Sequence, residues 1–501
     1  MAGHEIKKSE LILKLSHSIG KTLGELDNVG LFEKHKLHPK VKGIAGDVIE
    51  QCVIGYPADT EQKPDLSIDN IPWELKTTGM KKDKKGNFIA KEPMSITGVG
   101  IYDLSKQTFE NSHFWQKVQR LLLIYYFYNS SKAVTAYEYR NFVIESYDFH
   151  EFSNEDIDVL KKDWYIIHDF IKNIEISIEH PKGSQPWKDA LLCKYLENRH
   201  TFKKQLSFID LAPKFPPRFR LRKPVVNTII GKHFGYITDN TINAFKSLSE
   251  IELECLRLTD LYSGKTIRDI LRVFGINNIK ENKGISEQLI IRMFGGNAKK
   301  LNQVELFSKY GIIAKSITVT ETGARTEDMK LFPIDFNELI KTHYEIDNSI
   351  KTYEFEDSDF YAYFNDYKFL CIIFEEPKKS NNEKISLLEN KFIGFKIIQF
   401  SEPFIMTYVY KLWNYTRNQI INNELEMIQY YKNGNLVINK SGSIKEAPNF
   451  MKSSENPVFI RGGTATSSEK HKTECVNGLK MIPQYVWIKG TTIVKMLNLK
   501  K

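Results

Sequence analysis

Apolar residues along this chain recur at both helical and extended spacings, which predicts a mixed α/β architecture. Between Leu11 and Ile19 they recur at helical intervals, and they do so again around Val48 and Cys52, so that each segment would bury one face of a helix. A longer helix is predicted from Asn154, as its N-cap, through the apolar-periodic segment that follows. Three runs rich in apolar and β-branched residues predict strands over residues 71–76, 94–101 and 118–128.

Short sequence landmarks occur in the same order in both halves of the chain. Gly-Lys-Thr is followed by Lys-Gly-Ile, which opens an amphipathic segment, and then by a strand-like segment. These landmarks lie at residues 20–22, 42–44 and 71–78 in the first half and at 264–266, 283–285 and 313–320 in the second. Such self-similarity is typical of a duplicated domain. We expect one copy over residues 1–235 and another over 236–501, with the junction within 231–245.

Length, charge and cysteine content narrow the class of protein. The 501 residues exceed one ordinary domain, and 41% hydrophobic residues are enough to form several cores. The longest apolar run, residues 121–128, is far shorter than the roughly 20 residues of a membrane-spanning helix. Without an export signal or a CxxC pair among five scattered cysteines, we expect a cytoplasmic protein with reduced thiols. The net charge of +9 suits a polyanionic partner, but alone it more often reflects solubility.

Asp65, Glu74 and Lys76 form the strongest candidate for a catalytic site. Because Glu74 and Lys76 are two residues apart on a predicted strand, their side chains leave the same face, whereas Leu75 points into the core. Asp65, in the preceding turn, can join Glu74 in presenting carboxylate oxygens to a hard cation such as Mg²⁺. Lys76 would lie beside the metal-bound water and the scissile phosphate. This pattern predicts metal-dependent phosphodiester hydrolysis.

The spacing of Glu74 and Lys76 is a weak motif when taken alone. In a chain with 62 acids and 71 bases, an acid two positions before a base is expected roughly nine times by chance. The alternative interpretation is an ordinary surface strand that carries an ion pair. Apolar Trp73 and Leu75 favour a buried strand, and Glu50 on an upstream amphipathic helix offers a third carboxylate to the same cleft.

Six landmarks in the first half resemble the MutH family in sequence and order. They are GIAGDVIEQCVIG at 43–55, Lys63-Pro-Asp65, Trp73-Glu-Leu-Lys76, the segment that begins at His113, Asp163-Trp164, and PRFRLRKPVVNTIIG at 217–231. Within that family the chain is most similar to single-chain, GATC-cutting type II restriction endonucleases of the Sau type. The resemblance implies the PD-(D/E)xK restriction-endonuclease fold, a central mixed sheet with flanking helices, and hydrolysis of DNA with Mg²⁺.

The resemblance also implies roles for individual residues. Asp65 and Glu74 match the family's metal-binding acids, and Lys76 matches its catalytic lysine. Glu50 matches a helical glutamate at the active-site edge, expected to join the metal ligands, and Lys117 matches a lysine beside the DNA phosphate.

The match departs from the family pattern in two places. The interval from Asp65 to Glu74 is two residues longer than usual in the family, which leaves Asp69 as an alternative first ligand. The first half also lacks a clear loop of the type with which the family reads bases. The recognition sequence is therefore less well specified than the chemistry.

Basic residues outside this set are expected to contact DNA. Arg218, Arg220, Arg222 and Lys223 form a basic strand that would follow phosphates, and the alternative is a solvated strand face. In the second half, Arg461 lies in a segment that resembles the family's base-reading loop. The guanidinium of an arginine there suits bidentate contact with a guanine. The alternative there is a plain turn at the glycine pair that follows.

The second copy is expected to bind DNA without cutting it. Alignment of the two strand-like segments places Ser316 at the position of Glu74 and Thr318 at that of Lys76. Neither hydroxyl side chain supplies the carboxylate or ammonium charge that the chemistry needs.

These observations predict a bacterial, cytoplasmic type II restriction endonuclease that cuts double-stranded DNA with Mg²⁺. The resemblance implies unmodified GATC, cut 5′ of the guanine, with a cognate DNA methyltransferase that protects the same site. One active site cuts one strand, so two chains would self-associate on DNA or nick in sequence. No membrane partner is expected, and no nucleotide cofactor, because the glycine pairs lack the Lys-Ser/Thr of phosphate loops. The alternatives are a methyl-directed nicking repair endonuclease and a catalytically lapsed DNA-binding protein.

Overall fold

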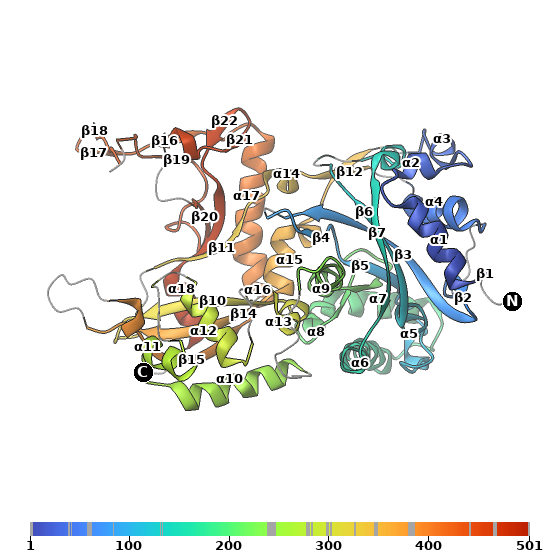
Figure 1. Cartoon of the computed structure of the whole chain (residues 1–501), viewed down its shortest axis with the longest axis horizontal. Coiled ribbons are helices and arrows are strands. Elements are labelled where there is room, and N and C mark those ends of the chain that lie inside the picture. Colours follow the sequence, from blue (N-terminus) through green and yellow to red (C-terminus); the bar gives the residue numbers. More distant parts are fainter. Residues whose placement is uncertain are drawn as a thin grey trace. The chain divides into compact units, whose positions relative to one another are not determined.

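The chain divides into two compact units in the computed structural model (Figure 1). Unit 1 comprises residues 1–250, 302–311 and 343–351, and unit 2 comprises 251–301, 312–342 and 352–501. The structure describes residues 4–38, 41, 43–57, 63–83, 85–130, 132, 134–237, 247–276, 281, 284–296, 300, 303–324, 327–344, 349–378, 386–439, 442–463 and 468–498. Most of the expected junction, as well as Lys42 and Lys283 of the repeated landmark, lies outside these residues.

The main sheet of unit 1 has the strand order β1-β2-β3-β6-β7, and β4 pairs with the distal part of β3. β3 runs parallel to β6 and antiparallel to β2, β7 is antiparallel to β6, and β1 is parallel to β2. The sheet is therefore mixed, with β3 and β6 at its centre. The strands are β1 (His4–Ile6), β2 (Leu66–Ile68), β3 (Ile71–Lys82), β4 (Phe88–Ala90), β6 (Arg120–Phe127) and β7 (Val143–Glu151).

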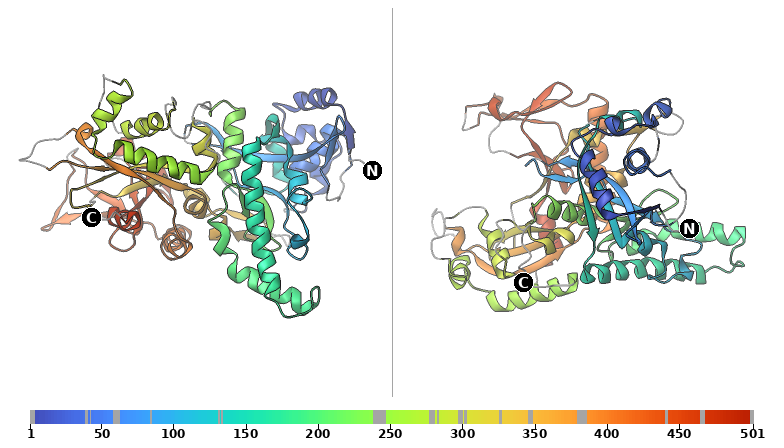
Figure 2. Two further views of the ribbon diagram at one scale, coloured as in Figure 1. Left: turned by 90° about the horizontal axis from the view of Figure 1, so that it is seen from below. Right: turned by 45° about the vertical axis from the view of Figure 1, so that its right-hand side comes forward.

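Both faces of this sheet are covered. Leu75 and Leu122 pack with Leu15 and Val48 of the helices that precede β2, whereas Tyr125, on the opposite face of β6, contacts the ring of Phe234 after α9. The long helices α6 and α7 lie side by side (Figure 2). The helices of unit 1 are α1 (Lys8–Ser18), α2 (Leu23–Leu26), α3 (Leu31–Lys34), α4 (Ile44–Val48), the π-helical segment η1 (Ile49–Ile54), α5 (His113–Val118), α6 (Asn154–Ile176), α7 (Gln185–Asn198), α8 (His200–Lys203) and α9 (Lys223–His233).

A second, antiparallel sheet of unit 1 has the order β5-β9-β8, with strands β5 (Met94–Gly98), β8 (Ile209–Leu211) and β9 (Arg218–Leu221). Phe219 of β9 packs its ring against Phe114 of α5, 5.0 Å between centroids. This contact brings β9 to the N-terminal end of β6, which directly follows α5. The second sheet therefore forms one wall beside the central strands.

Unit 1 also includes a helix from the second half of the sequence, α13 (Glu305–Lys309). Lys232 of α9 pairs with Glu305 at 2.9 Å, and Lys309 pairs with Asp156 of α6 at 2.7 Å. The units thus do not coincide with two continuous halves of the chain.

Unit 2 contains two three-stranded sheets, one mixed and one antiparallel. In the first, β14 lies between parallel β10 and antiparallel β15, and in the second, β23 lies between antiparallel β11 and β20. These strands are β10 (Ile312–Val319), β14 (Lys368–Glu375), β15 (Lys391–Ile398), β11 (Met329–Pro333), β20 (Val458–Gly462) and β23 (Gln484–Ile488). Two-stranded pairs join β16 (Met427–Gln429) with β19 (Glu446–Pro448), β17 (Tyr431–Lys432) with β18 (Asn435–Leu436), and β21 (Glu474–Val476) with β22 (Leu479–Met481).

One continuous apolar cluster of unit 2 includes Phe364, Cys371 and Leu412 and is formed by these sheets and by helices from residue 336 onward. The helices of the second half outside unit 1 include α10 (Leu248–Tyr262), α11 (Ile267–Val273), α12 (Ile285–Met293), α14 (Phe336–Leu339), α15 (Asp359–Asp366), α16 (Glu402–Phe404), the π-helical segment η7 (Ile405–Val409), α17 (Tyr410–Ile421) and α18 (Gly490–Leu497). A further strand pair, β12 (Thr342–Tyr344) and β13 (Ile350–Thr352), lies where the sequence passes between the two units.

The predicted mixed α/β architecture is confirmed, with local corrections. The strand predicted over 71–76 extends to Lys82, and the one predicted from 118 begins only at Arg120, because Val118 ends α5. The predicted cap of α6 at Asn154 is wrong by one residue. Ser153 has the extended backbone of an N-cap, and its side chain accepts a hydrogen bond from the backbone N–H of Asp156.

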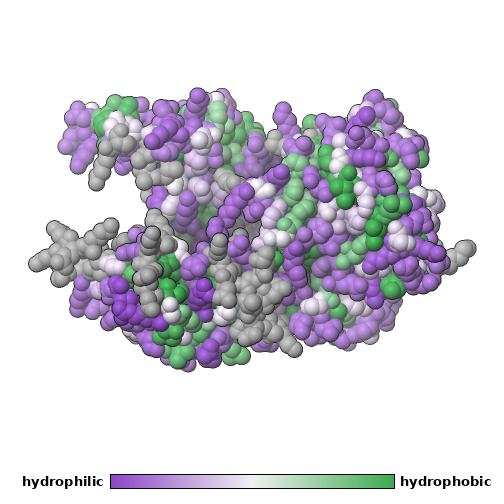
Figure 3. Space-filling model, in the orientation of Figure 1, coloured by the Kyte–Doolittle hydropathy of each residue, from purple (hydrophilic) through white to green (hydrophobic). Residues whose placement is uncertain are grey.

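Among the described helices, none is both long and apolar enough to cross a membrane. On the face drawn in Figure 3, hydrophilic side chains predominate and hydrophobic ones form small separate patches. The five cysteines are free thiols.

Candidate active site

A cleft of about 630 Å³ opens in unit 1 at the N-terminal end of β6. Its walls come from α4 and η1, the start of β3, the end of β5, α5 and β9. Six of the residues predicted to act on DNA line this single cleft. They are Glu50, Asp65, Glu74, Lys76, Lys117 and Arg218.

Strand pairing fixes the side chains of β3 at the cleft. Parallel pairing sets Glu74 opposite Leu121 and Lys76 opposite Leu123, so both charged side chains leave the same face of the sheet. Leu75 between them is buried in the apolar cluster on the other face. Its backbone N–H donates a 2.9 Å hydrogen bond to Oδ2 of Asp65, which holds that carboxylate beside Glu74.

Two ammonium groups neutralise the Glu74 carboxylate, which is only 1% exposed. Lys117 Nζ lies 3.0 Å from Oε1 and 2.9 Å from Oε2 of Glu74. The same Nζ lies 3.8 Å from Oδ1 of Asp65, so one cation is shared by two carboxylates. Lys76 Nζ also contacts Oε1 of Glu74, at 2.5 Å.

Burial raises the pKa of Asp65, and the neighbouring Glu74 carboxylate raises it further, to about 6, although Lys76 and Lys117 oppose the shift. The positive charge of the two lysines is therefore not enough to stabilise the deprotonated form of Asp65 fully. A divalent cation held between the carboxylates of Asp65 and Glu74 would supply further positive charge.

The residues present fit a magnesium ion that keeps much of its water. Asp65 and Glu74 provide hard oxygen donors, and the ammonium of Lys117 marks the point between them where a cation is stabilised. Within the described part of the chain, no group of three or more His, Cys, Asp or Glu side chains is arranged to hold a metal. Glu50 thus lines the cleft without completing a three-donor cluster, and its role as a metal ligand stays a prediction.

Asp47 is a carboxylate of the cleft that the sequence analysis missed. It precedes Glu50 by three residues where α4 runs into η1, so both side chains lie on one side of the helix. Burial raises the pKa of Asp47, and His35 partly opposes this shift. The spacing of the two acids was the signal that could have found it.

Asp69, the alternative first metal ligand, lies outside the cleft. It occupies the turn between β2 and β3 with a positive φ of 48°. Its Oδ1 accepts a 3.2 Å hydrogen bond from the backbone N–H of Lys8 at the start of α1. The geometry therefore favours Asp65.

The four basic residues around β9 have different environments. Arg218 is exposed and lines the cleft, so it is placed to reach a phosphate. Arg222 is 1% exposed and donates to the carbonyl oxygens of Ile209 and Lys203, which leaves its guanidinium no access to DNA. Lys223, the first residue of α9, is 8% exposed.

Arg220 donates two hydrogen bonds to Oδ2 of buried Asp210, from Nε at 2.8 Å and from Nη2 at 2.6 Å. Burial alone would raise the pKa of Asp210, but Arg220, together with Lys203 and Arg222, holds it below its ordinary value. Because the folded-state pKa is lowered, this pair stabilises unit 1 at neutral pH and the contribution is lost as the pH falls through the Asp210 pKa. We therefore assign Arg220 a structural role.

We expect Arg220→Met to destabilise unit 1 by about 3 to 5 kcal/mol, because it leaves the Asp210 charge buried without its partner. Urea denaturation at pH 7 would measure the loss. The double variant Asp210→Asn/Arg220→Met should recover most of it, since the unpaired carboxylate charge is then removed as well. A single variant as stable as the wild type would show that the pair contributes nothing.

In unit 2, Arg461 lies at the end of β20 and lines a separate pocket. Its Nη1 is 3.0 Å from Oδ2 of Asp328, and its guanidinium lies 4.0 Å from the ring centre of Trp487. The contact of Arg461 with a guanine stays a prediction.

Comparison with known proteins finds a family model that matches part of the chain around the cleft. Residues 54–163 match the family model described as DNA mismatch repair enzyme MutH. The resemblance to the MutH family is confirmed. The matched segment contains Asp65, Glu74, Lys76 and Lys117, the four side chains in ionic contact, but neither Glu50 nor the strand of Arg218.

A curated relative extends this likeness beyond the MutH segment. Type II restriction enzyme Sau3AI of Staphylococcus aureus is 24% identical over 349 residues, which is 66% of this chain. The match also covers 66% of that enzyme, so the chain spans just under two thirds of the relative's length.

Proposed function

We propose that this chain is a type II restriction endonuclease that hydrolyses phosphodiester bonds of double-stranded DNA with Mg²⁺. The observation that carries the proposal is the pair of carboxylates, Asp65 and Glu74, that shares the Lys117 ammonium beside Lys76 in an open cleft. The MutH match over these residues and the likeness to a type II restriction enzyme support it.

Each side chain of the cleft has a proposed part in the reaction. Asp65 and Glu74 would hold Mg²⁺, which when bound activates a water nucleophile and polarises the phosphate. Lys76, fixed by its contact with Glu74, would donate a hydrogen bond to a phosphate oxygen as negative charge builds up there. Arg218 on the rim would bind a flanking phosphate and set the position of the strand.

The proposed target is unmodified GATC, cut 5′ of the guanine and protected by a cognate methyltransferase in the bacterial cytoplasm. This part rests on the resemblance to GATC-cutting enzymes of the Sau type. Because unit 1 carries one cleft of this kind, cutting both strands would require two chains on one site or two successive nicks.

We also propose that the second half is a copy that does not cut. The order β3-β6-β7 and β5-β9-β8 of unit 1 recurs as β10-β14-β15 and β11-β23-β20 in unit 2, with the same strand directions. In both units the middle strand of the first sheet, β6 or β14, has eight residues. The two strands therefore provide a common frame for comparing the units.

Under this proposal, the sheet register supports an alignment of the two strands that differs by three residues from the alignment by sequence. Glu74 lies opposite the second residue of β6, and Ile313 lies opposite the second residue of β14. By the same register Lys315 takes the place of Lys76, so Ser316 and Thr318 are not the counterparts. An isoleucine cannot hold a cation, and the second copy keeps a lysine without its carboxylate.

The proposal predicts that the purified chain, incubated with plasmid and Mg²⁺, yields discrete linear fragments that EDTA abolishes. Plasmid methylated at GATC should stay intact, and plasmid without GATC should not be cut. Nicked circles as the final product would favour a nicking repair enzyme. A shifted but uncut plasmid would favour a DNA-binding protein without catalysis, and the endonuclease proposal would then be abandoned.

A further inference from the structure

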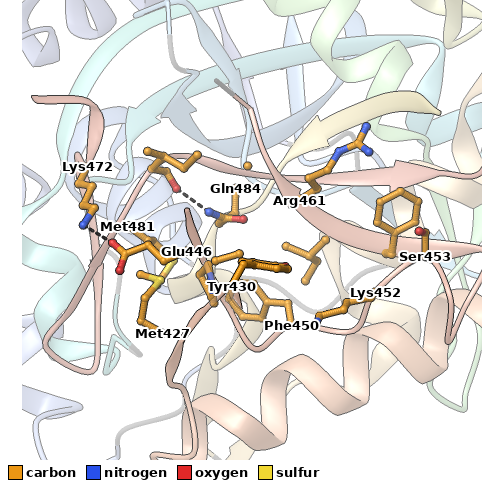
Figure 4. A pocket seen from close by; sticks show the side chains of 16 residues that line it. Met427, Tyr430, Glu446, Phe450, Lys452, Ser453, Arg461, Lys472, Met481 and Gln484 are labelled. Carbon is orange, nitrogen blue, oxygen red and sulfur yellow. Dashed lines mark hydrogen bonds and ion pairs between the residues drawn. The ribbon is translucent and has the colours of Figure 1, made fainter. Parts of the chain in front are cut away.

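Unit 2 contains a pocket of about 260 Å³ between its second sheet and the strand pair β16–β19 (Figure 4). The pocket belongs to unit 2 alone and none of the cleft residues of unit 1 lines it. Its volume is just below the roughly 300 Å³ at which pockets for drug-sized ligands begin. The pocket is therefore large enough for one planar ring system.

The walls of the pocket are aromatic and thioether groups. Phe450 and Met481 are 3% and 1% exposed and belong to the core of the unit, so they form a fixed wall. Tyr430 is half-buried, with Lys445 and Lys452 at 5.1 and 5.6 Å from its ring centre, and Met427 of β16 lies beside it (Figure 4). Flat aromatic and polarisable sulfur surfaces favour a stacked aromatic ligand.

One buried amide group offers specific hydrogen bonds inside the pocket. Gln484, the first residue of β23, is 2% exposed. Its Nε2 donates to the carbonyl oxygen of Ile482 at 2.8 Å. Its Oε1 is an acceptor that suits an exocyclic amine or a ring N–H.

The charges around the pocket are divided between its two sides (Figure 4). Lys472 is paired with Glu446 and Glu469, each at 2.6 Å, so this side carries no excess positive charge. On the opposite side, Lys452 and Arg461 are both exposed, and Arg461 also pairs with Asp328 at 3.0 Å. Two cations at the mouth of an aromatic pocket suit a ligand with an aromatic ring and an attached phosphate.

We propose that this pocket binds a single unstacked nucleobase, with its sugar phosphate on the side of Lys452 and Arg461. Tyr430 and the thioethers would stack on the base, and Gln484 would pair with its polar edge. The inference rests on the proposed function in so far as the base comes from DNA. The shared chemistry also admits a free nucleotide, and the test separates the two sources.

The experiment measures the affinity of the full-length chain, with Ca²⁺ in place of Mg²⁺, for duplexes that carry one mismatch at successive positions. A mismatch lowers the cost of extruding a base. The chain should therefore bind the duplex with the mismatch at one particular position about tenfold more tightly than the matched duplex. Tyr430→Ala should abolish that preference, because it removes the stacking surface, which contributes about tenfold in affinity. Met427→Trp, which fills the pocket, should do the same.

Tyr431→Ala is the matched control, because Tyr431 is the next residue, 63% exposed, and does not line the pocket; it should keep the mismatch preference. A second arm titrates the four deoxynucleoside monophosphates by calorimetry. Saturable binding there that Tyr430→Ala removes, without any mismatch preference, would assign the pocket to a free nucleotide. If neither the mismatch preference nor saturable nucleotide binding is observed, the inference is overturned. A chain that binds no duplex contradicts the proposed function instead, and the nucleotide arm still decides the pocket.

Discussion

Replacing Glu74 with glutamine should reduce DNA cleavage by at least about a thousandfold while leaving DNA binding nearly unchanged. Glutamine keeps the shape of the side chain but removes the charge that Lys76 and Lys117 contact and that would hold Mg²⁺. DNA binding should persist because phosphate contacts come from other basic residues, including exposed Arg218. Plasmid cleavage with Mg²⁺ and gel shift with Ca²⁺ would measure the two effects separately.

The matched control is Glu151→Gln, at the end of β7, where the side chain is 58% exposed and pairs only loosely with Arg120 at 3.6 Å. It should cut like the wild type. Since Glu74 is nearly fully buried, circular dichroism must show that its variant is folded. If it is not, Lys76→Met offers the same test from a residue with a more exposed side chain. Cleavage at the wild-type rate by a folded Glu74→Gln variant would rule out the site assignment.

The sequence was informative where the chemistry is local. Glu74 and Lys76 fall within one strand, so the two-residue period of a strand was enough to place them on the same face, and Asp65 lies close in sequence, directly before β2. Lys117 lies 43 residues from Glu74 along the chain. No local pattern connects them, and only the family resemblance brought Lys117 into the site.

Charge patterns alone did not separate a DNA-binding strand from a structural one. Arg218, Arg220 and Arg222 alternate along the sequence in the same way, yet only Arg218 is exposed. Arg220 pairs with Asp210, and Arg222 donates to the carbonyl oxygen of Ile209. Both partners are on β8, which sheet pairing brings next to β9. Partners brought in by tertiary structure are not visible in the basic segment itself.

Strand register could not be predicted for a similar reason. Residues 313–320 are mostly apolar or hydroxylated, and several alignments with the strand of Glu74 preserve that character. If the second half is the proposed copy, the pairing of β10 with β14 selects one of them, in which Lys315 and not Thr318 corresponds to Lys76. Hydrogen bonds to a neighbouring strand, and not the side chains of the strand alone, set this register.

Removing the Lys117 ammonium should destabilise unit 1 by about 3 kcal/mol when no divalent cation is present. Its Nζ lies within 3.0 Å of both oxygens of buried Glu74, and truncating one partner of a buried pair leaves an uncompensated charge. Lys76 retains one contact with Glu74, which limits the loss. Urea denaturation of Lys117→Met in EDTA would measure it.

Mg²⁺ should restore most of the stability that Lys117→Met loses, because the divalent ion would supply positive charge at the point where the ammonium lay. Lys161→Met is the control: Lys161 pairs with exposed Glu110, so the change in stability should be small and independent of Mg²⁺. An equal loss in EDTA and in Mg²⁺ would contradict a shared cation position. If the ion does replace the ammonium, Lys117 is released from Glu74 at the moment when DNA and metal are both present. The contact with the carboxylates and the expected contact with a phosphate would then be successive states of one side chain.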